Sequence, residues 1–125
     1  MKDFDTLRDQ VLVMGLDDWV PLLAVDMAAM KAGWNDEERR DVVLAAIQSL
    51  AEGGLVEIGE LIRGAGFRPW GTSVDTSIAR LRARYRVAPD DEIETSDQWW
   101  FDCWLNNTPS GDQRGQARYD ADIAT

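Results

Sequence analysis

Apolar residues recur every three or four positions along several stretches of the chain, a spacing typical of helices with one buried face. The first stretch covers residues 3–14, and Gly15 is expected to end it. A second helix is expected to start near Asp17, with Pro21 in its first turn, and to end at Gly33. The pattern therefore begins with two helices in close succession.

A third helix has the clearest start and end signals. Asn35 is a good N-cap, three acidic residues follow it in the first turn, and Gly53 and Gly54 stop the helix. At 100° per residue, one face of this helix collects mostly apolar side chains. That face consists of Arg39, Val43, Ala46, Ile47 and Leu50.

Partial alternation and turn residues predict a β-hairpin after the third helix. Residues 55–62 form its first strand, residues 64–66 the turn and residues 67–70 a short return strand. Thr72 or Ser73 is expected to cap a fourth helix. The buried stripe of that helix is Val74, Ile78, Leu81 and Tyr85.

A final strand is predicted over residues 99–105, and we expect it to pair with the hairpin. Together these elements predict an α+β fold with three helices, a hairpin, a fourth helix and a C-terminal strand. A length of 125 residues suits one domain, which we place at residues 1–106. The remaining residues, 107–125, are polar and are expected to form a flexible tail.

The junction between the third helix and the hairpin resembles that of the winged helix-turn-helix family. The matching positions are Ile47, Leu50, Gly54, Leu55 and Val56. This resemblance covers about residues 3–70 and implies that the hairpin is the wing. Two further segments, residues 66–70 and 103–109, look like those in small uncharacterised bacterial proteins, a likeness that implies no known activity.

Charge is unevenly distributed along this acidic chain. There are 13 Lys and Arg against 23 Asp and Glu, a net charge of −10. Residues 63–88 are the exception, with six Arg and one Asp. This basic segment is either neutralised by the acidic segments on either side of it or forms a positive patch that binds an acidic partner. In the second case, Arg80 and Arg84 are best placed, because they lie opposite the buried stripe of the fourth helix.

Residue types argue against catalysis. The sequence contains no His, the most frequent general base and metal ligand. Cys103 lies in an apolar run, where a free Cys is usually a small buried residue. The densest acidic cluster, residues 90–97, lacks the spacing of a calcium loop. We therefore expect no enzyme activity, no catalytic residue, no cofactor and no metal site.

Tryptophans mark the final strand as a candidate contact. Alternation places Trp99, Phe101, Cys103 and Leu105 on a core face, and Trp100, Asp102, Trp104 and Asn106 on the other. Large aromatic rings mixed with polar groups are typical of a partly wet interface. The second face is therefore a candidate site for self-association or for a partner, unless the fourth helix or the tail covers it.

These features favour a non-enzymatic protein-binding module, of inhibitor, antitoxin or immunity type, that meets a basic protein partner. The alternative is a winged-helix transcriptional regulator that binds DNA through residues 63–86. We expect no duplex binding, because the exposed face of the third helix carries Glu38, Asp41 and Glu52. The N-terminus resembles no signal peptide and no apolar run approaches about 18 residues, so a cytoplasmic protein without membrane contact is expected.

Overall fold

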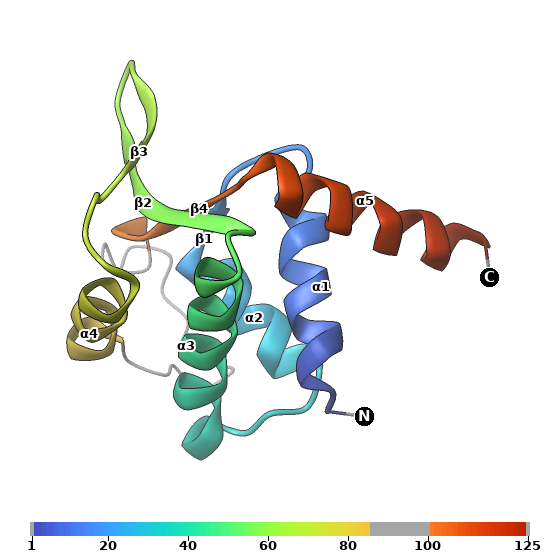
Figure 1. The fold of residues 1–125 in the computed structure, drawn as a ribbon. Coiled ribbons are helices and arrows are strands. Elements are labelled where there is room, and N and C mark those ends of the chain that lie inside the picture. The colour runs from blue at the N-terminus through green and yellow to red at the C-terminus, as the bar shows by residue number, and fades with distance from the viewer. Residues whose placement is uncertain (1, 86–100, 125) are drawn as a thin grey trace.

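The computed structural model describes residues 2–85 and 101–124 and has an α+β architecture (Figure 1). The elements follow in the order α1 (Phe4–Met14), β1 (Val20–Pro21), α2 (Leu22–Lys31), α3 (Asp36–Glu52), β2 (Val56–Ile62), β3 (Gly66–Pro69), α4 (Val74–Arg84), β4 (Trp104–Asn107) and α5 (Pro109–Ala124). Within the described ranges, no helix combines the length and the apolar character needed to cross a membrane.

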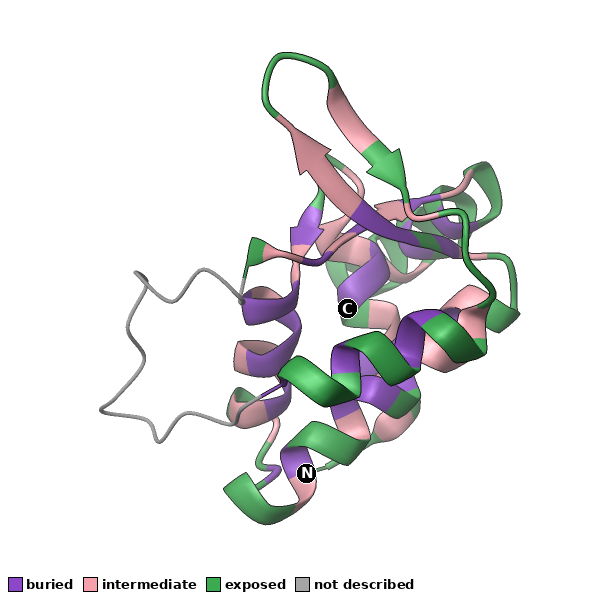
Figure 2. Cartoon of the chain, turned by 90° about the vertical axis from the view of Figure 1, so that its left-hand side faces the viewer, coloured by how far each residue is buried: buried purple, intermediate pink, exposed green. Residues whose placement is uncertain are grey.

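The strands form one antiparallel sheet in the order β1-β4-β2-β3. Strand β4 lies between β1 and β2, so that Leu105 is opposite both Val20 and Ile58. The prediction that the last strand pairs with the hairpin is therefore confirmed. The hairpin β2–β3 extends beyond the helices, and its turn is exposed (Figures 1 and 2).

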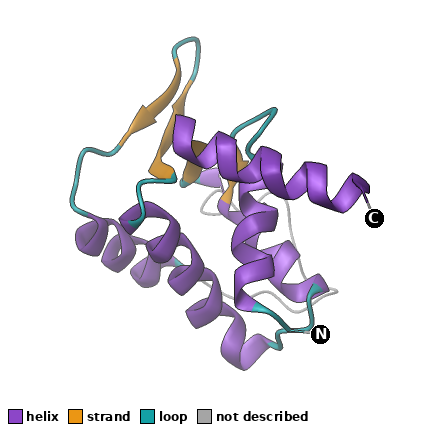
Figure 3. Cartoon of the chain, turned by 45° about the vertical axis from the view of Figure 1, so that its right-hand side comes forward, coloured by secondary structure: helices purple, strands orange, loops and turns teal. Residues whose placement is uncertain are grey.

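Helices α1, α2 and α3 pack together on one side of the sheet, and α4 packs against α3 (Figure 3). The start of α3 is as the sequence predicts. The Asn35 side chain accepts a hydrogen bond from the Glu38 amide (3.1 Å), and the Glu38 carboxylate accepts one from the Asn35 amide (3.2 Å). The core includes the predicted apolar positions of α3 and α4: Val43, Ala46, Ile47, Leu50, Ile78, Leu81 and Tyr85.

The prediction that the second helix starts near Asp17 is wrong. Pro21 is an extended N-cap (φ −75°, ψ 157°), and α2 begins at Leu22. Residues 20 and 21 instead pair with β4, and the Leu22 amide donates to the Cys103 carbonyl (3.1 Å). A strand of two residues is too short to show an alternating pattern in the sequence. Only its pairing with β4 identifies it as a strand.

The final strand begins later than predicted. It starts at Trp104, whereas residues 99 and 100 lie outside the described part of the chain. Cys103 and Leu105 are buried as expected, but Phe101 is 37% exposed, so its assignment to the core is wrong. The reason is that the alternation of side chains holds only within the extended segment, and Phe101 precedes it.

Helix α5 occupies most of the region for which the sequence predicts a polar tail. It packs on α1 at Gly115 and on the α3–β2 connection at Gly111, and both glycines allow a very close backbone approach. A Cβ on Gly111 would lie 1.9 Å from the Leu55 carbonyl oxygen, and one on Gly115 would lie 2.8 Å from that of Leu12. The helix was missed because its docked face is made of backbone, whereas sequence patterns detect side chains.

Candidate functional site

The arginines of the basic segment are largely occupied by contacts within the described residues. Three of them form ion pairs: Arg68 with Glu60 (2.7 Å), Arg82 with Asp41 (2.9 Å) and Arg84 with Asp102 (2.6 Å). The Arg82 contact also lowers the pKa of the Asp41 carboxyl. Arg80 lies over the Trp70 ring, with its guanidinium carbon 4.0 Å from the ring centre. The segment therefore offers less free positive charge than its composition indicates.

Two of the remaining predicted contact residues, Trp104 and Asn106, lie in the described part of the chain. Trp100 lies outside the described residues. Trp104 is half-buried in β4, and its indole nitrogen donates to the Phe101 carbonyl (2.8 Å). The Asn106 amide donates to the Glu57 carboxylate (3.2 Å). Both side chains thus bond to neighbours other than Arg80 and Arg84.

Asn106 instead borders a pair of adjoining hollows lined by carboxylates. The larger has a volume of about 610 Å³ and the smaller about 300 Å³, and both are lined by Leu16, Asp17 and Asp112. Asp120 lines the larger, and Asp18, Trp19 and Asn106 line the smaller. We call these residues together the acidic groove. No Lys or Arg is among the residues that line either hollow.

The acidic groove is assembled from segments that are far apart in the chain. Its walls are the α1–β1 loop, the end of β4 and the part of α5 from Asp112 to Asp120. Asn107 holds these parts together, because its amide donates to the Leu12 carbonyl at the end of α1 (2.8 Å). Thr108 then begins α5: its hydroxyl donates to the Gly54 carbonyl (2.6 Å) and accepts from the Gly111 amide (3.1 Å).

Trp19 is the one large apolar side chain exposed at the acidic groove among the described lining residues. It is 38% exposed, and the Asp18 carboxylate accepts a hydrogen bond from its backbone amide (2.7 Å). The sequence predicts Asp17 and Asp18 as a helix start and Trp19 as part of that helix. The adjacent Asp-Asp-Trp run was the signal for this site, but only the structure brings it beside Asp112 and Asp120.

A buried polar cluster joins three helices elsewhere in the fold. Asp26 of α2 accepts hydrogen bonds from the Arg39 guanidinium of α3 (3.1 Å) and from the Tyr85 hydroxyl at the end of α4. Asp26, Arg39 and Tyr85 are all almost completely buried. Burial raises the pKa of Asp26 and that of Tyr85. This cluster positions helices rather than presenting reactive groups to solvent.

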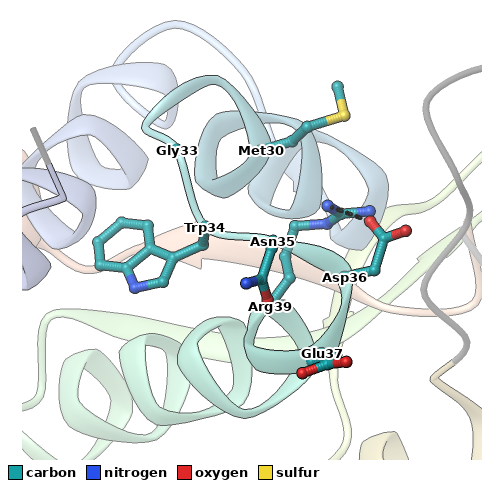
Figure 4. A pocket seen from close by; sticks show the side chains of 7 residues that line it. All are labelled: Met30, Gly33, Trp34, Asn35, Asp36, Glu37 and Arg39. Atoms are coloured by element: carbon teal, nitrogen blue, oxygen red, sulfur yellow. Dashed lines mark hydrogen bonds and ion pairs between the residues drawn. The ribbon is translucent and has the colours of Figure 1, made fainter.

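Beside that cluster lies a hollow of about 530 Å³ at the α2–α3 turn, lined by Met30, Trp34, Asn35 and Glu37 among others (Figure 4). Arg39 borders it, but its guanidinium is also bonded to the Asp36 carboxylate (2.9 Å), as the dashed line in Figure 4 shows. Two carboxylates already bond the Arg39 guanidinium. Its positive charge is therefore compensated and does not favour an anionic ligand in this hollow.

Cys103 is fully buried, and burial raises the pKa of its thiol to about 12. It is therefore a poor nucleophile at neutral pH. Among residues 2–85 and 101–124, no three His, Cys, Asp or Glu side chains are grouped so that they could hold a metal ion. The acidic run at 90–97 lies outside the described residues.

A scan of protein-family models, a search of curated proteins and a search of solved structures each gave no match to this chain.

Proposed function

We propose that this chain is a non-enzymatic, cytoplasmic protein-binding module that uses the acidic groove to hold a basic segment of a partner protein. The observation that carries this proposal is the contrast between the two charged regions. Asp17, Asp18, Asp112 and Asp120 gather around two hollows without a cation among the lining residues. Three arginines of the basic segment, Arg68, Arg82 and Arg84, in contrast form pairs with the protein's own carboxylates.

Such a groove supports recognition by two physical effects. Carboxylates that line a concave surface concentrate negative potential, which steers a cationic partner and fixes its orientation. The exposed Trp19 ring adds apolar contact and a surface over which a Lys or Arg of the partner can stack. An inhibitor, antitoxin or immunity-type protein with a basic target would have this combination.

A winged-helix body remains part of this proposal. It is supported by the order α1, α2, α3 and hairpin β2–β3 over the first 70 residues. The DNA-binding alternative is less well supported, because Asp41 and Glu52 are exposed on α3 and Arg82 is paired with Asp41. Fold likeness alone would not decide between these functions.

The direct test compares two labelled probes in anisotropy titrations near physiological salt: a Lys/Arg-rich peptide and a random-sequence DNA duplex. We expect the peptide to bind and the duplex not to bind. Added salt should weaken peptide binding, because exposed charges are screened. The Asp17→Asn/Asp112→Asn variant should weaken it by at least about tenfold, which corresponds to ~1.4 kcal/mol.

The matched control is Glu37→Gln/Asp75→Asn, which removes the same charge from exposed positions on α3 and α4. It should change peptide affinity by less than about twofold. An equal loss in both variants would mean that net charge alone attracts the peptide, and the groove proposal would fail. Tight duplex binding that is lost in Arg80→Ala/Arg84→Ala would instead support the regulator.

A further inference from the structure

A second hollow has a different chemistry from the acidic groove. It lies between α1 and α2, has a volume of about 490 Å³, and is lined mainly by apolar side chains. Val13 and Met14 come from α1, and Ala24, Met27 and Ala28 come from α2. We call these five residues the apolar groove. All five are half-buried rather than fully covered, so the groove presents apolar surface to solvent.

Helix α5 extends past this groove with its own apolar side chains exposed. After Gly115 no residue of α5 in the described chain is buried, and the helix projects away from the body (Figures 1 and 3). Tyr119 is 46% exposed and Ile123 is 64% exposed, the two highest values for large apolar residues within the described ranges. They are four residues apart, so they lie on the same face of α5.

The projecting helix and the groove are next to each other, because Asp122 of α5 also lines the apolar groove. A concave apolar site and two protruding apolar side chains therefore occupy one continuous face. A two-fold interface requires such a self-complementary surface, in which each copy supplies both the protrusion and the recess. We propose that this face joins two copies of the chain, with Tyr119 and Ile123 of each copy inserted into the apolar groove of the other.

Charge favours a second copy as the occupant. Lys31 lies at the edge of the apolar groove, is exposed, and has no ion pair with any other described residue. Asp120 lies on the exposed part of α5, between Tyr119 and Ile123 in the chain, and its recorded side-chain contact is with the Gln116 amide. Insertion of α5 brings Asp120 of one copy toward Lys31 of the other. The same pairing occurs twice across a two-fold axis.

This interface uses mostly different residues from the proposed function. It uses the α1–α2 face and the distal half of α5, whereas the acidic groove is built around Asp17 and Asp112. Asp120 also lines the acidic groove and is the residue that the two proposals share. It also differs from the strand surface at Trp100 and Trp104 that the sequence predicts for self-association. Dimerisation and peptide binding are measured independently, so either result can fail without the other.

Sedimentation equilibrium of the full chain over a range of concentrations tests the dimer. We expect a monomer–dimer equilibrium that Tyr119→Ala/Ile123→Ala weakens by at least about tenfold. Both side chains are exposed, so the variant should retain its circular dichroism and its unfolding midpoint. Trp19→Ala is the matched control, because it removes another exposed aromatic ring and should leave the dimer unchanged.

A charge reversal identifies the contact itself. Lys31→Glu and Asp120→Lys should each weaken the dimer, and the double variant Lys31→Glu/Asp120→Lys should restore it. A chain that stays monomeric at every concentration would overturn the proposal. A dimer that is indifferent to Tyr119→Ala/Ile123→Ala would also overturn it and would place self-association elsewhere, for example at Trp104. Failure of the double variant to recover would exclude the Lys31–Asp120 pairing, and with it this arrangement of the two copies.

Discussion

Helices α4 and α5 are attached to the rest of the protein in two different ways. At the junction of α2, α3 and α4, the contact is made by buried side chains: Asp26 accepts from Arg39 and from Tyr85. Where α5 meets α1 and the α3–β2 connection, the contact is made by backbone that approaches closely at Gly115 and Gly111, respectively. Ion pairs are present at both, but the Arg114–Asp9 pair is far more exposed than the Arg39–Asp26 pair.

This difference predicts which changes each junction tolerates. Removing one member of a buried ion pair leaves a charge without compensation, whereas exposed pairs contribute little. The α2–α3–α4 junction should therefore be sensitive to the loss of a charged partner. The attachment of α5 should instead be insensitive to the loss of one exposed charge and sensitive to added volume, because there a single methyl group has no room.

The largest effect is expected for Asp26→Ala. This change leaves the buried Arg39 guanidinium without its main partner, at a cost of roughly 3–5 kcal/mol in the free energy of unfolding. Urea denaturation followed by circular dichroism measures it. Asp36→Ala is the control, because Asp36 bonds the same guanidinium but is exposed. Equal losses in the two variants would contradict the distinction between buried and exposed partners.

The next largest effect is expected for Gly111→Ala. The new Cβ would clash with the Leu55 carbonyl oxygen, so α5 must shift, at a cost of about 1–3 kcal/mol. Gln113→Ala, two residues along the same helix and exposed, is the control and should be near neutral. Denaturation together with protease sensitivity of residues 109–124 would report the loosened helix. A neutral Gly111→Ala would show that the close approach is not needed to hold α5.

A smaller effect is expected in the pH dependence of stability. Because burial raises the pKa of Asp26 above its ordinary value of 3.8, the folded state retains this proton to higher pH than the unfolded state. The carboxyl group therefore contributes less to stability as the pH rises from about 4 through its folded pKa. The stability of the wild type minus that of Asp26→Asn should fall over this interval.

Both proteins contain the carboxyls whose pKa is lowered, such as Asp41 and Glu38, whose contributions to the pH dependence of stability have the opposite sign. The difference between the two stabilities removes those contributions. Unfolding midpoints measured at several pH values for both proteins provide the comparison. A difference that rises with pH would mean that Arg39 and Tyr85 stabilise the ionised carboxylate more than burial opposes it.

The smallest effect is expected for Arg114→Ala. It removes an exposed ion pair to Asp9 (3.2 Å) and should cost less than about 1 kcal/mol. Arg118 also pairs with Asp9, so the remaining carboxylate keeps a partner. The same denaturation measurement applies, and its result should depend on salt. If the free energy of unfolding falls as much as in Gly111→Ala, then ion pairs rather than close packing hold α5 in place.

Helices α3 and α4 were predictable because their signals are local. Asn35 and Ser73 cap them, and their apolar stripes repeat with the helical period. Arg39 was placed correctly on the buried face of α3 by that period alone. The identity of its partner, Asp26, was not predictable, because Asp26 is 13 positions away on another helix whose start was itself misplaced.

The acidic groove was only partly predictable for a related reason. Composition indicates an acidic protein, and the Asp17-Asp18 pair is visible in the sequence. That Asp112 lies beside Asp17 depends on α5 docking against α1 and on β4 ending at Asn107. The predicted core position of Phe101 was wrong because the strand starts at Trp104, so the alternation does not reach Phe101.

The sequence by itself determined the α+β class, the caps and buried faces of α3 and α4, the hairpin and the acidic character of the chain. Each of these depends on residues within one helix or one turn of each other, where propensity and periodicity act directly. The tertiary structure alone decided the pairing of β1 with β4, the docking of α5, the Asp26–Arg39–Tyr85 cluster and the ion pairs of three arginines in the basic segment. Those features depend on distances between residues that only the packing of separate elements brings together, and at Gly111 and Gly115 on the absence of a side chain.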